Sequence, residues 1–99
     1  MILKINNGKL DLCNNSGSRV RNICSKDVVD ADLSSDESLI LVTLNNGRVD
    51  LRKASGALVK NIVTHDAVGA RWQGDDIAVR RKDGKIDLRK QSGSLIRTI

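Results

Sequence analysis

The sequence is nearly free of aromatic residues: Trp72 stands alone, and there is no phenylalanine or tyrosine. Surfaces that bind single-stranded nucleic acid stack bases on aromatic rings, and sugar sites use aromatic faces as well. One aromatic residue therefore argues against a lectin and against a base-stacking surface. Proline is also absent, so nothing forbids regular ladder hydrogen bonds along a strand. The apolar content is dominated by isoleucine, leucine and valine, which favour strands.

Long apolar runs are missing too, and the N-terminal stretch MILKINNGK is interrupted by polar residues. Secretory signals and transmembrane helices both need longer unbroken hydrophobic segments. We therefore expect a cytoplasmic protein with no membrane partner.

Cysteine is scarce, with only Cys13 and Cys24. They flank a predicted turn near Ser16, which places Arg19 opposite Cys13 and leaves Cys24 five residues further along the strand. That offset is roughly 17 Å at about 3.3 Å per residue, whereas bridged Cα atoms lie within about 7 Å. The spacing predicts two free thiols, as expected in a reducing compartment.

The feature that is abundant is repetition. Gly47 to Ile62 reads GRVDLRKASGALVKNI, Gly84 to Ile99 reads GKIDLRKQSGSLIRTI, and Gly8 to Ile23 is a looser copy, GKLDLCNNSGSRVRNI. The three leading glycines are 39 and 37 residues apart. A period of about 40 residues built from short strands is typical of propeller blades and related arrays.

Each copy divides into four predicted strands. In the second copy these are a small-residue strand at 28–33, an apolar strand at 38–45, an alternating strand at 48–52 and an outer strand at 58–63. The dipeptides Asn7-Gly8, Asn46-Gly47 and Asp83-Gly84 predict two-residue type I′ hairpins, in which both central residues have positive φ. The first copy lacks its small-residue strand, and residues 2–5 align by sequence with residues 41–44.

Four antiparallel strands in about 38 residues describe a propeller blade, and the chain resembles the WD-repeat-like β-propeller superfamily over its whole length. The Gly-His and Trp-Asp dipeptides that define true WD repeats are absent from this chain, so no functional residue can be inferred from the resemblance. The expected fold is all-β, with about 2.75 blades of four antiparallel strands in a single domain, residues 1–99. The blade repeats are 1–26, which lacks the inner strand, 27–65 and 66–99.

Three blades cannot close a ring, because closed propellers have four to eight blades. An open fan would expose apolar blade faces. We therefore expect homodimerisation into a six-bladed ring, with a trimer or a fragment of a larger protein as the alternatives.

An aspartate recurs in the middle of the alternating strand, at Asp11, Asp50 and Asp87. Its position predicts cross-strand pairing with neighbouring arginines rather than a cation site. His65-Asp66 resembles half of a catalytic dyad, but Lys26-Asp27 occupies the same repeat position, which indicates an ordinary surface histidine. No nucleophile elbow, metal-spaced cluster or phosphate loop occurs. We predict no enzyme activity, no catalytic residue, no metal and no cofactor.

The formal charge is +5, which favours an acidic partner. The residues that would contact an anion, either nucleic acid or a phosphorylated small molecule, are Arg80, Arg81, Lys82, Arg52 and Arg89. The residues that would line a central channel are Asp30, Asp32 and Arg71. The leading hypothesis is a self-assembling protein–protein interaction platform, such as an accessory protein of a phage or mobile element. Anion binding by the basic turns or the channel is the alternative.

Overall fold

The computed structural model describes residues 1–99 as eleven β-strands and no helix. No segment of it is a helix that could cross a membrane. The strands are β1 Ile2–Asn6, β2 Lys9–Cys13, β3 Arg19–Cys24, β4 Val28–Leu33, β5 Leu39–Leu44, β6 Val49–Lys53, β7 Leu58–Val63, β8 Ala67–Gln73, β9 Asp76–Arg81, β10 Ile86–Arg89 and β11 Leu95–Thr98.

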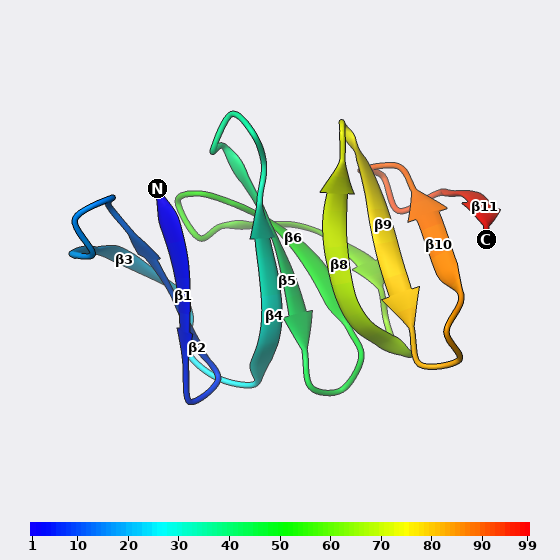
Figure 1. Ribbon diagram of the computed structural model, residues 1–99, viewed down its shortest axis with the longest axis horizontal. Helices are drawn as coiled ribbons and strands as arrows, with labels where there is room; N and C mark the ends of the chain where they lie inside the picture. Colours follow the sequence, from blue (N-terminus) through cyan, green and yellow to red (C-terminus); the bar gives the residue numbers. More distant parts are fainter.

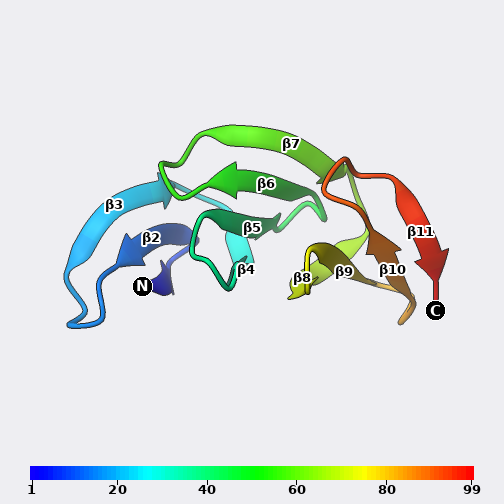
Figure 2. The same ribbon diagram turned by 90° about the horizontal axis from the view of Figure 1, so that it is seen from above.

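The strands form three antiparallel sheets, which we call blade 1 (β1–β3), blade 2 (β4–β7) and blade 3 (β8–β11). Each sheet keeps its strands in chain order, and blade 1 has three strands where the others have four. Figure 1 shows the sheets side by side, and Figure 2 shows them fanned as an arc with β3, β7 and β11 on its outer rim. The expected all-β arrangement of about 2.75 blades is confirmed. The expected closure into a ring needs a second chain, so it stays a prediction.

Two hydrophobic cores hold the fan together, and each lies between neighbouring blades. Blades 1 and 2 enclose seven buried residues: Leu10, Leu12, Ile23, Val28, Ile40, Val42 and Leu44. Blades 2 and 3 enclose eight: Leu41, Val49, Leu51, Ile62, Ala67, Ala70, Ile77 and Val79. Blade 2 thus buries both of its faces, because β5 is apolar on both sides. The small residues of the inner strand are needed there, since a Cβ on Gly69 would lie 2.7 Å from the Arg80 guanidinium and from Asp30 Oδ2.

The turn prediction was right for the first copy and wrong for the other two. Asn7 and Gly8 both have positive φ, 52° and 78°, as a type I′ turn requires. In the later copies only the glycines do, with φ of 87° at both Gly47 and Gly84. The preceding side chain instead caps the turn: Asn46 Oδ1 accepts the Arg48 N–H at 3.0 Å, and Asp83 makes the same contact. The first loop has two residues, 7–8, whereas the later loops have three, 45–47 and 82–84, in which the Asx cap takes the place of the I′ conformation.

That difference shifts the register of blade 1 by one residue relative to the sequence alignment. Leu3 pairs with Leu12, and Leu41 pairs with Leu51 at the matching position of blade 2. Leu3 therefore corresponds to Leu41, not to Val42, and the alignment of residues 2–5 with 41–44 was wrong. A shift of one residue exchanges the two faces of a strand. Lys4 consequently lies on the open side of blade 1.

Candidate interaction surface

The recurring aspartates are structural, as predicted. Asp50 is fully buried and accepts hydrogen bonds from Arg48 Nη2 at 3.0 Å and from Asn61 Nδ2 at 2.6 Å. Asp87 accepts from Thr98 Oγ1 at 2.7 Å and lies between the Arg81 and Arg89 guanidiniums. These carboxylates tie β6 to β7 in blade 2 and β10 to β11 in blade 3.

Sequence reasoning missed the outer-strand partner of each aspartate. Asn22, Asn61 and Thr98 occupy one repeat position, and each donates to the aspartate of its own blade. A polar residue that recurs inside the last strand, just before the apolar Ile23, Ile62 and Ile99, was the available signal.

The three residues predicted to line a channel lie together on the inner strands. Arg71 of β8 is bonded to the carboxylate of Asp30 on β4. This hydrogen bond raises the pKa of Arg71 further, although partial burial opposes the rise. Asp32 accepts the backbone N–H of Trp72 at 2.9 Å, and its own carbonyl accepts Trp72 Nε1 at 3.2 Å. The trio therefore joins blade 2 to blade 3, and Trp72 packs at the interface between these blades.

The five residues proposed for anion binding do not form one patch. Arg52 and Arg89 donate to the carbonyls of Gly56 and Gly93, so they close the turns before the outer strands. Arg80 and Lys82 are exposed. Arg81 is paired with Asp83 at 2.8 Å and with Asp87 at 3.4 Å.

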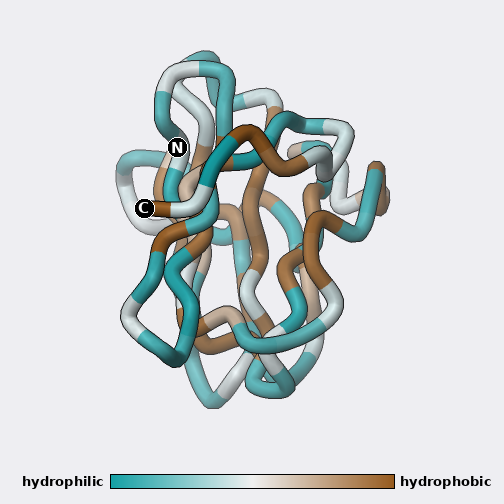
Figure 3. The backbone as a smooth tube through the Cα atoms, turned by 90° about the vertical axis from the view of Figure 1, so that its right-hand side faces the viewer, coloured by the Kyte–Doolittle hydropathy of each residue, from teal (hydrophilic) through white to brown (hydrophobic).

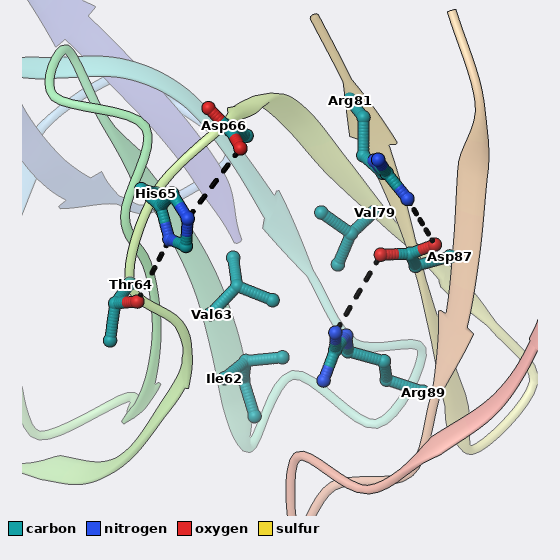
Figure 4. Close-up of a pocket in the computed structure, with 9 residues that line it drawn as sticks. All are labelled: Ile62, Val63, Thr64, His65, Asp66, Val79, Arg81, Asp87 and Arg89. Atoms are coloured by element: carbon teal, nitrogen blue, oxygen red, sulfur yellow. Dashed lines mark hydrogen bonds and ion pairs between the residues drawn. The ribbon is translucent and has the colours of Figure 1, made fainter. Parts of the chain in front are cut away.

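One cavity of about 390 Å³ lies between blades 2 and 3, beside the 64–66 linker. Figure 4 shows Arg81, Arg89 and Asp87 on one side of it and His65 on the other. His65 is an exposed surface residue: its ring lies 3.0 Å from the Thr64 hydroxyl and 3.6 Å from Asp66, with 75% of the side chain accessible. Two arginines and two carboxylates, those of Asp66 and Asp87, line the cavity, so these groups together offer an anion little net charge. The structure contains no cluster of three or more His, Cys, Asp or Glu side chains, and both cysteines are free, as expected.

Asp87 is predicted to make the stability of the fold depend on pH. Burial raises the pKa of Asp87, but the Thr98 hydroxyl and the Arg81 and Arg89 charges together hold the pKa below the usual 3.8 of an aspartate. A carboxyl with a lowered folded pKa stabilises the fold above the unfolded pKa, and this contribution is lost as pH falls through the folded value.

We therefore expect the difference in melting temperature between wild type and Asp87→Asn to be constant above about pH 5 and to shrink below pH 4. Thermal unfolding from pH 7 to 2.5 measures it. Taking the difference between the two proteins removes the parallel contribution of Asp36, whose pKa is lowered to about 2 by the hydroxyls of Ser38 and Ser34. A difference that stays constant down to pH 2.5 would contradict the assignment.

The surface that most distinguishes this molecule is the outer face of blade 3, which we call the open face. It consists of Ala78, Ile86, Leu88 and Ile99, with Arg80 on the same side of β9. The equivalent residues of blade 2, Leu41, Val49, Leu51 and Ile62, are at most 4% exposed because blade 3 covers them. On the open face Ile99 is 73% exposed and the others are half-buried. Figure 3 looks toward this side of the molecule and shows hydrophobic stretches interleaved with hydrophilic turns.

The opposite end of the fan, the outer side of blade 1, is more polar. Ile2 is 47% exposed where the matching Ile40 and Ile77 are fully buried. Lys4 takes the place that Val42 and Val79 have in the other blades, and Asp11 lies beside it across the β1–β2 ladder. The expectation that both ends of the fan are apolar thus holds for blade 3 and only in part for blade 1.

Comparisons with solved structures identify the fold. Sqt1 from Saccharomyces cerevisiae superimposes with a TM-score of 0.75 at 21% identity, over 94% of this chain and 28% of that one. BamB from Moraxella catarrhalis gives 0.77 at 15% identity, over 98% and 31%. The WD40 domain of Pan2 from Neurospora crassa gives 0.75 at 15% identity, over 98% and 32%.

No protein-family profile and no curated protein sequence matches the chain significantly. The chain spans about a third of the length of the structures it matches. At these low sequence identities, the structural similarity shows a shared fold and not a shared activity. The three sheets are therefore consecutive blades of a β-propeller of the kind found in WD40 domains.

Proposed function

We propose that this chain is a non-enzymatic, self-associating β-propeller that serves as a platform for binding other proteins. One observation carries the proposal: the same repeat positions that are buried between blades 2 and 3 lie open on blade 3. Apolar side chains placed for packing against a further blade mark an interaction face. Propellers act through the loops and surfaces that they display, so the fold suits a scaffold.

Two copies related by a twofold axis would place the open face of each against blade 1 of the other, giving six blades and no uncovered end. The joint would be less apolar than the contact between blades 2 and 3. Arg80 replaces the buried Thr43, and Lys4 replaces the buried Val42. Asp11 is the carboxylate nearest in the ladder to offset these charges. We therefore propose an association that depends on protein concentration, with the net positive charge favouring acidic partners on the remaining surface.

The absence of enzyme activity is part of the same proposal. The only histidine, His65, is exposed and its nearest carboxylate, Asp66, is exposed as well. No serine or cysteine is bonded to that histidine, and its one hydroxyl contact is with Thr64, the exposed residue next to it in the chain.

Static light scattering tests the self-association directly. We expect a mass of about 21.6 kDa, twice the 10.8 kDa of one chain, and a return to 10.8 kDa in Leu88→Lys. A lysine there would bury a charge at the joint, which disfavours assembly.

The matched control is Val59→Lys, which places the same charge on the outer strand β7, where Val59 is already 47% exposed. This variant should keep the mass of wild type. A wild-type mass of 10.8 kDa at all concentrations, or equal dissociation in both variants, would contradict assembly through the open face.

A further inference from the structure

β1 is the only second strand of a blade that has no neighbour on its inner side. β5 lies between β4 and β6, and β9 lies between β8 and β10, whereas β1 pairs with β2 alone. The pair that flanks a two-residue hairpin turn, here Asn6 and Lys9, exchanges hydrogen bonds, and the pairs then alternate along the ladder. The backbone N–H groups of Leu3 and Ile5 therefore point to the open edge.

The turn between β9 and β10, in the last blade, lacks a contact that the two equivalent turns make. The carbonyl of Gly8 accepts the Val28 N–H at 2.9 Å, and that of Gly47 accepts the Ala67 N–H at 3.0 Å. No backbone N–H reaches the carbonyl of Gly84. A Cβ on Gly84 would meet nothing within 4 Å, whereas one on Gly47 would lie 2.5 Å from Asp66 N. The missing donor is the first residue of an inner strand.

The unpaired edge of β1 and the unbonded carbonyl of Gly84 are the two places that a single inner strand would contact. β4 is this inner strand for blade 2, since its first residue binds the Gly8 turn while the strand pairs with β5. β8 is the inner strand for blade 3 in the same way, with the Gly47 turn and β9. Where the open face of one copy meets blade 1 of another, one strand fits between the Gly84 turn of the first and the β1 edge of the second.

We propose that this joint captures an extended segment of a partner protein as an added inner strand. The contact with Gly84 rests on the self-association proposed above, whereas the pairing of β1 with β2 alone is seen within one chain. An exposed strand edge offers main-chain hydrogen bonds to such a segment, and the pockets beside it select its side chains.

The two inner strands already present define the chemistry of the segment. They read VVDADL and AVGARW, with small residues where the neighbouring blade is close. Ala70 is 1% exposed, and Gly69 leaves no room for a side chain. β4 would lie beside the added strand with Val28, Ala31 and Leu33, which pack toward blade 1, whereas Asp30 and Asp32 face blade 3. The favoured partner is therefore a segment of about six residues without proline, with small apolar residues where it faces blade 2.

A fluorescently labelled peptide with the sequence of residues 66–73, DAVGARWQ, tests the proposal by anisotropy with the full chain. We expect saturable binding that a scrambled peptide does not show. A peptide N-methylated at alternate residues on its pairing edge should bind at least tenfold more weakly, because it has lost the donors for β1. Absence of saturable binding, or equal binding of the N-methylated peptide, would overturn the proposal.

A pair of protein variants locates the site. Ile5→Pro removes one N–H from the open edge without removing a bond to β2, and Ile5→Ala makes a comparable loss of side chain. We expect about tenfold weaker peptide binding for Ile5→Pro only. Circular dichroism verifies that both variants are folded.

The molecular mass of the same samples separates this proposal from the one before it. Peptide binding to a 10.8 kDa species would support strand capture and exclude the ring. A dimer that ignores the peptide would support self-association and overturn strand capture.

Discussion

Leu51→Ala should lower the free energy of unfolding by about 3 kcal/mol, within the range for a leucine removed from a closed core. Leu51 is 1% exposed and lies in the cluster that joins blade 2 to blade 3. The cost combines lost burial with the cavity that would remain, because the neighbouring strands are held by their ladders and collapse little. Urea unfolding followed by the fluorescence of Trp72 measures it, since that single tryptophan packs against the same cluster.

Leu88 supplies a matched control, because it has the same place in the repeat and lies on the open face. In dilute protein we expect Leu88→Ala to cost less than about 1 kcal/mol. The cost should rise with protein concentration if a second copy covers Leu88, since binding to the native state adds to apparent stability. Equal losses for Leu51→Ala and Leu88→Ala at every concentration would contradict the difference in burial on which the proposed assembly depends.

Asp50→Ala is the second substitution with a large expected effect, a loss of about 2 to 3 kcal/mol. The Asp50 carboxylate is fully buried, and its loss leaves the Asn61 amide and the Arg48 guanidinium without their partner. Removing one member of a buried pair costs more when the other cannot return to water. The Arg48 side chain is 39% exposed and is rehydrated in part, which keeps the loss below that of a fully enclosed pair.

The same aspartate on the outer side of blade 1, Asp11, is the control. It keeps the bond to Asn22 at 3.0 Å, but its side chain is 18% exposed and Lys9 lies 4.0 Å away. We expect Asp11→Ala to cost about 1 kcal/mol by urea unfolding. Asp50→Asn should lie between wild type and Asp50→Ala, because it preserves shape and loses only the charge. A larger loss for Asp11→Ala than for Asp50→Ala would refute the role assigned to burial.

Local signals gave the right strands and two wrong details. The spacing of apolar and charged residues predicted β4 and β7 at the bounds observed, and it placed Arg19 opposite Cys13, as the ladder confirms. Asn-Gly and Asp-Gly predict the same type I′ turn, yet only Asn7-Gly8 forms it. Short motifs permit more than one turn, and the dipeptide alone does not say whether the loop has two residues, as at 7–8, or three, as at 45–47 and 82–84.

The candidate sites show what the sequence pattern could not predict, which is where side chains lie relative to one another. The aspartates were assigned correctly to structural pairing, but Arg48 and Arg89 pair with them from two residues away along the chain and not from across the ladder. Their outer-strand partners could be found only by seeing which recurring polar residue lies opposite. The five basic residues share a charge and not one surface. Arg52 and Arg89 close turns, Arg81 and Arg89 line one cavity beside Asp87, and Arg80 and Lys82 are exposed. Side chains of one charge gather into a site only if the backbone brings them to one surface.

By itself, the sequence determined the repeat unit, its strands and the number of blades, because strand formation depends on the local alternation of apolar, polar and turn residues. Only the tertiary structure decided which blade faces are covered. Leu51 and Leu88 are the same residue in the same phrase, and one is enclosed while the other is accessible. Burial depends on the neighbour that packs against a residue, and no repeat encodes whether that neighbour is present.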